Sequence, residues 1–273
     1  MLVLTDIQPK NILLGVLDDS CFERFERDEL DYPMPRKELP SRTVYVSRPM
    51  PLSKGAPLLC DLSEARFGTS SNSDFVMPDV YRAPEVILGM PWSYPIDLWG
   101  FAMTVCGFHP SQHAFACRLV LFCTTALLTL TQLWDLFEPR RLFNPHDGNR
   151  RYSEHLHLAQ MISILGPPPV DFLQRSEKSK LFWDEEGTYI HSACIGHNTL
   201  INGLGTWKGE VPIPATSLSD EESRLEGEEK ALFLVFMRKM LQWKPEDRKS
   251  IREITEDEWL LADLIESGQV VRE

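Results

Sequence analysis

The chain has 273 residues, of which 43% are hydrophobic and 25% charged, with 15 glycines and 20 prolines. This is ordinary globular composition, which excludes a chain disordered throughout, a collagen and a small disulfide-stabilised protein. The formal net charge of -12 argues against direct, nonspecific nucleic-acid binding and favours a basic partner.

Short apolar runs alternate with polar segments in the first 80 residues. Residues 2–4 and 12–14 are such runs, and the apolar residues 58–60 indicate a short buried strand. Residues 17–57 are polar and proline-rich, which predicts a loop or a partly helical insertion. Residues 62–80 are rich in Ser, Gly and Asn and are expected to form a loop.

Helical signals dominate from Tyr81 onward. The segment from Ala231 to Leu241 has apolar residues all round, as a buried helix would have. The segment from Ile251 to Leu264 is amphipathic, and Ser250 with Glu253 three residues later forms the pattern of a capping box.

Three other features indicate the setting of the chain. The six cysteines include no CxxC pair, so neither a zinc ribbon nor a thioredoxin motif is indicated. The first residues do not resemble a secretory signal, so we expect reduced thiols and a cytoplasmic or nuclear location. The acidic run at residues 219–230 is interpreted as a solvated loop and helix start, with attraction of basic substrates as the alternative.

Residues 105–132 do not fit an ordinary helical domain. They contain one charged residue, Arg118, and three of the six cysteines. The stretch from Leu119 to Leu133 resembles a weak membrane span, but it is shorter than the ~20 apolar residues required and contains several threonines. We therefore expect no membrane association.

Three polar residues beside apolar strands suggest a chemistry. Asp6 and Asn11 are separated by four residues and precede one apolar strand, and Asp61 follows another. In phosphoryl transfer one carboxylate takes the proton of the attacking hydroxyl, while an amide oxygen and a second carboxylate hold Mg²⁺. A D-x-x-x-x-N match alone is common, and a turn with an Asx cap is the alternative interpretation.

Residues 78–104 (PDVYRAPEVILGMPWSYPIDLWGFAMT) resemble the end of a protein-kinase activation segment. Ala83-Pro84-Glu85 corresponds to the A-P-E motif, and Asp97-Leu98-Trp99-Gly100 to the start of the central helix of the C-terminal lobe. Tyr81-Arg82 resembles the CMGC group. Together with the insertion before Asp61 and the later LFNP, ILGPPP and DRKSIREITEDEWL segments, the chain is similar to fungal SR-protein-kinase-like sequences.

The resemblance implies a role for each matching residue. Asp6 would be the catalytic base, and Asn11 and Asp61 would bind Mg²⁺ and, through it, ATP. Glu85 would form a structural pair with Arg248, tying the activation segment to the late helices.

Asp97 would be structural too, because it would hold the backbone of the catalytic loop from the central helix. The implied activity is ATP-dependent phosphorylation of Ser/Thr in Arg/Ser-rich proteins. The alternative is a catalytically inactive, pseudokinase-like fragment that acts only as a protein-binding module.

The chain departs from the family pattern in what precedes the catalytic loop. The resemblance places a Gly-rich loop, a strand Lys and a helix Glu before this loop, and only five residues precede Asp6. We therefore expect the N-terminal lobe to be absent and the fold to be the mostly α-helical C-lobe of a protein-kinase-like α+β fold.

Single positions within the motifs also depart from the pattern. The H-R-D motif is Leu4-Thr5-Asp6, and Leu4 cannot form a hydrogen bond as His does. Gln8 stands where the family has a lysine and cannot supply positive charge to the γ-phosphate. The D-F-G motif is Asp61-Leu62-Ser63, in which Ser63 loses the freedom of glycine.

Residues 105–132 are a further departure from the family pattern. Joining Thr104 to Leu133 gives DLWGFAMTLWDLFEPRRLF, which resembles the family's central helix without a gap. Val105-Cys106 is what GTATGT, a common intron donor, encodes, and Gln132 is what CAG, an acceptor, encodes. We hypothesise a translated intron of 28 codons; a true family insertion or a membrane hairpin are the alternatives, and transcript reads across the region decide between them.

The expected organisation follows from these assignments. Residues 1–104 would hold the catalytic loop, the loop insertion, the activation segment and the start of the central helix. Residues 105–132 would be the anomalous insertion, residues 133–265 the remaining helices of the C-lobe, and residues 266–273 a tail.

Overall fold

The computed structural model describes residues 2–16, 18–49, 57–67, 72–103, 140–183 and 207–266. The segment 105–132, and with it the intron hypothesis and the membrane-like stretch, lies outside the described residues. The chain divides into two compact units, one formed by Ile12–Cys60 and the other by Met1–Asn11 together with Asp61–Glu273.

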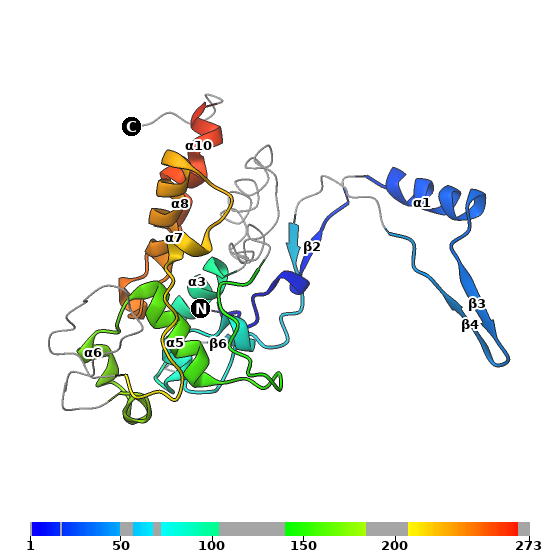
Figure 1. The fold of residues 1–273 in the computed structure, drawn as a ribbon. Coiled ribbons are helices and arrows are strands. Elements are labelled where there is room, and N and C mark those ends of the chain that lie inside the picture. Colours follow the sequence, from blue (N-terminus) through cyan, green and yellow to red (C-terminus); the bar gives the residue numbers. More distant parts are fainter. Residues whose placement is uncertain are drawn as a thin grey trace. The chain divides into compact units, whose positions relative to one another are not determined.

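The described residues of the smaller unit form two antiparallel strand pairs and one helix (Figure 1). β2 (Ile12–Leu14) pairs with β5 (Pro57–Leu59), and α1 (Ser20–Asp31) is followed by a hairpin of β3 (Arg36–Leu39) and β4 (Arg42–Tyr45). A short strand is confirmed close to the expected 58–60, but its expected burial is wrong, because Leu58 is 58% exposed. The partly helical insertion is confirmed, whereas the hairpin was not anticipated by the polar composition.

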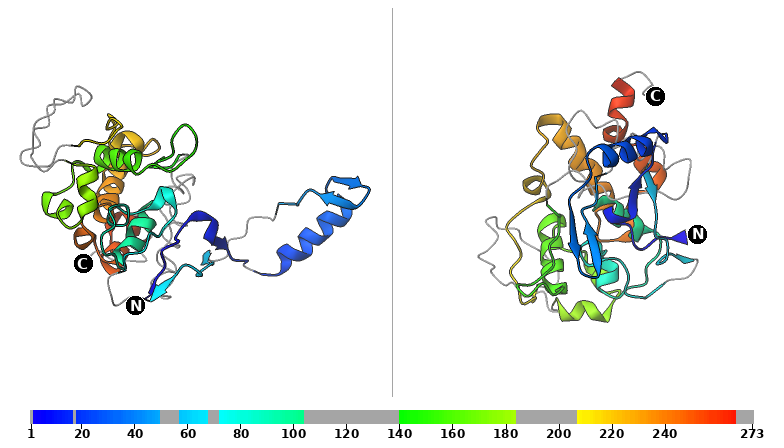
Figure 2. Two further views of the ribbon diagram at one scale, coloured as in Figure 1. Left: turned by 90° about the horizontal axis from the view of Figure 1, so that it is seen from below. Right: turned by 90° about the vertical axis from the view of Figure 1, so that its right-hand side faces the viewer.

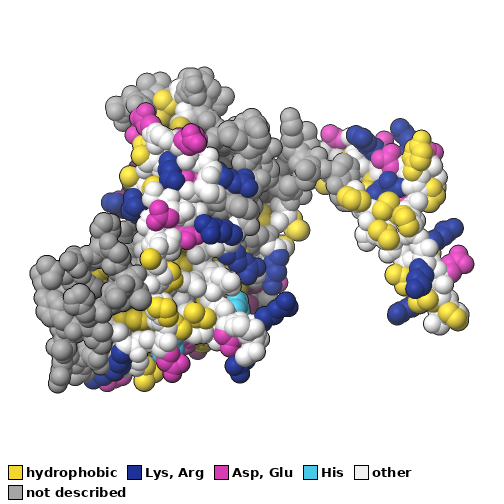
Figure 3. Space-filling view, in the orientation of Figure 1, with side chains coloured by type: hydrophobic (Ala, Val, Ile, Leu, Met, Phe, Trp, Pro, Cys, Tyr) yellow, Lys and Arg dark blue, Asp and Glu magenta, His cyan; other side chains and the backbone are white. Residues whose placement is uncertain are grey.

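Within the smaller unit none of the described side chains is buried. Arg48 donates to the Glu29 carboxylate at 2.8 Å and to the Asp28 carbonyl at 2.9 Å, which ties the segment after β4 to the last turn of α1. Large hydrophobic residues stay exposed, with Leu30 at 75% and Tyr32 at 77%. Figure 3 shows such side chains gathered over α1 and the hairpin.

The larger unit is mainly helical in its described part, with the single strand pair β1 (Leu2–Val3) and β6 (Arg66–Phe67). Figure 2 shows this unit from two further sides. Its α-helices are α2 (Pro84–Ile87), α3 (Pro95–Ala102), α5 (Glu154–Leu165), α6 (Val170–Leu173), α7 (Leu218–Glu221), α8 (Gly227–Met240), α9 (Ile251–Thr255) and α10 (Glu258–Glu266). Short 3-10 helices are η1 (Pro9–Asn11), η2 (Asp79–Tyr81), η4 (Glu177–Leu181) and η5 (Pro245–Asp247).

Aromatic side chains build the core of the larger unit. Trp99 of α3 stacks on Phe143 with ring centroids 6.2 Å apart, and both are fully buried. Phe233 and Phe236 of α8 lie 5.1 and 4.9 Å from the ring of Trp259 in α10. Burial of such large rings dominates the stabilisation of a core of this kind.

The helix starts show which local predictions hold. The capping box of Ser250 and Glu253 is confirmed, since the Glu253 amide donates to Ser250 Oγ and the Ser250 amide donates to Glu253 Oε2 at 2.8 Å. The single amphipathic helix expected over 251–264 is wrong: α9 ends before Asp257, whose carboxylate accepts the amide of Trp259 at 2.9 Å and so caps the new helix α10.

The acidic run at 219–230 is only partly solvated. Glu222 within it is buried, and its Oε1 accepts the amides of Arg224 and Leu225, both at 2.7 Å.

In α8 the apolar surface is not fully buried, because Val235 is half exposed. No helix within the described ranges is long and apolar enough to cross a membrane.

Arg248 joins three parts of the larger unit through one buried side chain. Its two Nη atoms donate to the carboxylate of Glu85, each at 2.6 Å, and Nη1 also donates to the Pro95 carbonyl at 2.9 Å. Its Nε donates to the Gln242 carbonyl at 3.2 Å, and its guanidinium lies 5.2 Å from the Trp99 ring centroid. The side chains of both Arg248 and Glu85 are almost entirely excluded from solvent.

We predict that Arg248→Gln lowers the free energy of unfolding by about 3–5 kcal/mol, because it leaves the Glu85 carboxylate buried without a charged partner. Urea unfolding of the full chain measures this. The control is Arg252→Gln, since Arg252 pairs with Glu256 at 3.1 Å but is 87% exposed, and such surface pairs contribute about 0.5 kcal/mol. Equal losses in the two variants would contradict the assignment.

Candidate active site

The loop after β1 places two amide side chains on the carboxylate of Asp6. Asn11 Nδ2 donates to Asp6 Oδ2 at 2.9 Å and to the Asp6 carbonyl at 3.0 Å, and Gln8 Nε2 donates to Asp6 Oδ1. Asn11 lies in η1 and is 4% exposed. Asp6 and Asn11, predicted to act together, are therefore in direct contact.

Asp97 of α3 holds the backbone that leads into Asp6. Its Oδ2 accepts the amide of Leu4 at 2.9 Å and its Oδ1 accepts the amide of Thr5 at 3.1 Å. Burial raises the pKa of Asp97 to about 6, although the two amide hydrogen bonds act in the opposite direction. The Asp97 carboxylate thus lies in the N-terminal turn of α3 and holds the backbone of Leu4 and Thr5 through these two hydrogen bonds.

Thr5 connects this loop to the segment that follows Asp61. Its backbone has φ of +58°, and its buried hydroxyl donates to the Glu64 carbonyl at 2.7 Å. Strands β1 and β6 extend the connection, with Leu2 opposite Phe67. The side chain of Leu4 cannot form a hydrogen bond to the segment after Asp61. The neighbouring Thr5 hydroxyl forms that hydrogen bond instead.

Asp61 lies exposed at the start of that segment with a left-handed backbone, φ +58°. Non-glycine residues in this region are strained by about 1–3 kcal/mol, and such strain concentrates at functional sites. The hydroxyl of Ser63 donates to Asp61 Oδ1 at 2.7 Å. The remaining oxygen, Oδ2, is available for another partner.

The donor set suits a hard cation. Because Asn11 uses its nitrogen on Asp6, its Oδ1 is the group that can ligate a metal, and Asp61 adds a carboxylate oxygen. In the part of the chain that the structure describes, no three His, Cys, Asp or Glu side chains gather into a metal cluster. Mg²⁺ is commonly bound by one or two protein oxygens together with water and phosphate oxygens, so the oxygens of Asn11 and Asp61 are ligands of the type it takes.

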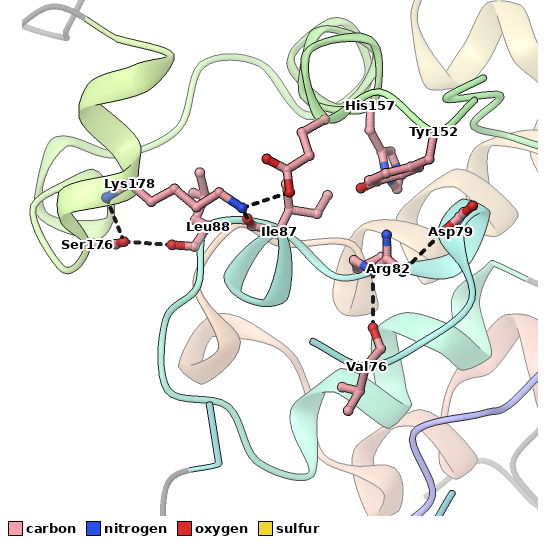
Figure 4. Close-up of polar contacts among 10 residues, drawn as sticks. Val76, Asp79, Arg82, Ile87, Leu88, Tyr152, His157, Ser176 and Lys178 are labelled. Atoms are coloured by element: carbon pink, nitrogen blue, oxygen red, sulfur yellow. Dashed lines mark hydrogen bonds and ion pairs between the residues drawn. The ribbon is translucent and has the colours of Figure 1, made fainter. Parts of the chain in front are cut away.

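Arg82 organises the segment between residues 72 and 82 (Figure 4). It is 5% exposed, and it donates from Nε to the Val76 carbonyl at 3.1 Å and from Nη2 to the Met77 carbonyl at 2.9 Å. Its guanidinium lies 3.8 Å from the ring centroid of Phe75 and 4.6 Å from that of Tyr152. One side chain thus holds the turn that precedes the A-P-E motif.

The end of helix α2 is held by residues far along the chain. Lys178 Nζ donates to the Ile87 carbonyl and to Glu154 Oε1, both at 2.7 Å, and Ser176 Oγ donates to the Leu88 carbonyl at 2.6 Å (Figure 4). Carbonyls in the last turn of a helix have no partner within the helix, and a cation there also complements the helix dipole.

Tyr152, just before α5, and His157, in the first turn of α5, lie next to Arg82. Tyr152 Oη lies 3.2 Å from His157 Nδ1. Burial raises the pKa of Tyr152 to about 12 and lowers the pKa of His157 to about 3, and the positive charge of Arg82 lowers the latter further. His157 is therefore a neutral residue of the core.

Several contacts of the site were not anticipated from the sequence. Thr5, Gln8 and Ser63 each supply a side-chain hydrogen bond, although two of them were noted only as departures from a motif. Gln8 and Ser63 stand two residues after Asp6 and Asp61, but this spacing alone does not predict that the side chains make contact.

Comparison with known proteins identifies relatives of the chain. It is 37% identical over 250 residues to a serine/threonine protein kinase of Aspergillus fumigatus, covering 90% of this chain and 52% of the relative. It is 26% identical over 205 residues to the serine/threonine-protein kinase SRPK of Physarum polycephalum, covering 74% and 38%. Dual specificity tyrosine-phosphorylation-regulated kinase 3 of Rattus norvegicus is 26% identical over 211 residues, covering 76% and 30%.

These matches cover only part of each relative. The chain spans about half the length of the curated Aspergillus relative and less of the other two. No family model matches the chain.

The raised pKa of Asp97 predicts a dependence of stability on pH. Because the folded state keeps this proton up to about pH 6 and the unfolded state loses it near 3.8, the contribution of Asp97 is largest in acid and falls as the pH rises from about 4 to about 6. We expect the unfolding free energy to fall by about 3 kcal/mol over this range relative to Asp97→Asn.

Urea unfolding of both proteins at pH 4, 5, 6 and 7 measures the difference. A gap between the two proteins that stays constant from pH 4 to pH 7 would contradict the raised pKa.

Proposed function

The chain belongs to the serine/threonine protein kinases, and from this premise we propose that it carries out ATP-dependent phosphoryl transfer to hydroxyl groups of proteins. The contact of Asn11 Nδ2 with the Asp6 carboxylate at 2.9 Å carries the proposal, because it joins the proposed base to a proposed metal ligand in one partly buried arrangement. In this reaction the protein contributes mainly positioning and electrostatic stabilisation.

We assign one role to each residue of the site. Asp6 accepts the proton of the attacking Ser or Thr hydroxyl. Asn11 and Asp61 would hold Mg²⁺, which would neutralise charge on the phosphates of ATP. Asp97 keeps the loop of Asp6 in place through the Leu4 and Thr5 amides.

Glu85 and Arg248 support the segment that would face the protein substrate. Their ion pair fixes α2, directly after the turn held by Arg82. The proposed substrates are basic, Arg/Ser-rich proteins. The net charge of -12 supports this choice, since an acidic surface attracts basic partners at long range.

A catalytically inactive protein-binding module is the second candidate. The neutral Gln8 favours it, because an amide cannot neutralise the γ-phosphate as a lysine does. The two candidates differ in whether phosphate is transferred at all, so an assay of phosphate transfer that includes the variant Asp6→Asn separates them.

The proposal predicts phosphoryl transfer when the chain is joined to the half of the kinase that it does not span. We would fuse it to the part of the Aspergillus relative that it does not span and measure transfer of labelled phosphate from Mg·ATP to an Arg/Ser-rich peptide. We expect Asp6→Asn to lower kcat at least about 100-fold, the usual contribution of a catalytic base.

Two controls accompany the assay. Asp19→Asn changes an exposed carboxylate in the smaller unit and is expected to leave kcat unchanged. The chain without the added half is expected to bind Mg·ATP more weakly than micromolar, because the family's Gly-rich loop and strand Lys lie in that half. A fusion that binds Mg·ATP but transfers no phosphate would favour the binding module.

A further inference from the structure

We propose that Gln8 and Ser63, the two residues that depart from the family's motifs beside Asp6 and Asp61, are positioning residues that hold these two carboxylates. The inference rests on the proposed function for its catalytic consequence. The hydrogen bonds themselves stand on geometry alone.

Gln8 engages the Asp6 oxygen that Asn11 leaves free. Asn11 Nδ2 donates to Oδ2 and Gln8 Nε2 donates to Oδ1, so both oxygens of the carboxylate have an amide donor from the same loop. Each carboxylate oxygen has two lone-pair sites, so one site on each oxygen remains to accept the proton of a substrate hydroxyl. The two donors fix the plane of the carboxylate without blocking it.

The Gln8 side chain is well placed to stay in this arrangement. The residue is partly buried, and its backbone carbonyl accepts the Asn11 amide at 2.9 Å within the turn that forms η1. A lysine at this position would add charge, whereas glutamine adds orientation only. Positive charge beside the phosphates would then be supplied by the bound Mg²⁺.

Ser63 does for Asp61 what Gln8 does for Asp6. Its hydroxyl donates to Asp61 Oδ1 at 2.7 Å, and the following turn is closed by the Ala65 amide on the Leu62 carbonyl at 3.1 Å. Asp61 is exposed, so few neighbours restrict its rotamer, and the glycine found here in the family has no side chain to donate. Ser63 therefore restrains the Asp61 carboxylate through Oδ1 and leaves Oδ2 as the oxygen that would ligate the metal.

Groups that orient a metal ligand or a catalytic group influence affinity and rate without touching the substrate. Loss of such a partner commonly weakens metal binding or activity by about 10- to 100-fold. We therefore expect Ser63→Ala to act on metal affinity and Gln8→Ala to act on kcat.

The first experiment follows the side-chain NH₂ signals of Gln8 by NMR in the full chain. We expect them to be displaced from those of the exposed Gln174, with proton exchange about tenfold slower, as a charge-assisted hydrogen bond requires. Asp6→Ala should move them to the Gln174 values. Gln8 signals that already coincide with those of Gln174 would overturn the proposal for this residue.

The second experiment titrates the full chain with Mg²⁺ alone. Ser63→Ala should raise the dissociation constant about tenfold. The matched control is Ser20→Ala, because Ser20 lies two residues after Asp18 and its side chain hydrogen bonds to it in the smaller unit. Equal dissociation constants for Ser63→Ala and Ser20→Ala would overturn the proposal for Ser63.

Kinetics of the fusion with the Aspergillus part distinguish a role of Gln8 in positioning Asp6 from a role in stability alone. Gln8→Ala should lower kcat about tenfold with KM for ATP and peptide unchanged, and Gln8→Lys, which keeps a donor, should restore it. Unchanged kcat in Gln8→Ala would overturn the catalytic consequence. If no variant transfers phosphate while the Gln8 signals depend on Asp6, the proposed function fails and the hydrogen bond remains.

Discussion

The buried ion pair of Glu85 and Arg248 is the constraint on which the larger unit depends. The guanidinium makes two bonds to the carboxylate and one to the Pro95 carbonyl, and it lies against Trp99. Two charges buried in this way are costly unless each is fully paired. The pair therefore stabilises one relative placement of α2, of the start of α3 and of the segment after α8.

Two residues of α3, Pro95 and Asp97, connect the ion pair to the candidate site. Pro95 begins the helix and contacts Arg248, and Asp97 in its first turn accepts the amides of Leu4 and Thr5. The next residue is Asp6, which is held by Gln8 and Asn11. A run of hydrogen bonds thus links a buried ion pair to the proposed catalytic carboxylate. The contacts from Arg248 to Thr5 use backbone groups, and Asp6 is then held by the buried Asn11 and the partly buried Gln8.

How much of this was predictable depends on the range of each interaction. The capping box of Ser250 could be predicted because its two partners are three residues apart. The break at Asp257 could not, because the hydrophobic period continues across it while the cap of α10 acts on a single backbone amide. The solvation of Glu222 was predicted wrongly for a similar reason. The segment around it is acidic, which suggests exposure, but the amides of Arg224 and Leu225 donate to its carboxylate in a buried position.

Contacts between distant residues required the family resemblance. Nothing in periodicity or spacing joins Glu85 to Arg248 or Asp97 to Leu4, and these contacts were expected only from matching motifs. Where the motifs change, the resemblance gave no guide. Thr5, Gln8 and Ser63 were noted as departures or passed over, and only the three-dimensional arrangement gives them partners.

The central claim is that Asn11 and Asp61 hold one metal ion beside Asp6. Substituting paramagnetic Mn²⁺ for Mg²⁺ in the presence of ATP, and recording amide signals of the full chain by NMR, tests it most directly. The account predicts selective broadening of the amides of residues 6–11 and 61–64, and loss of that broadening in Asp61→Asn. Broadening confined to another acidic region, such as residues 219–230, would contradict the account.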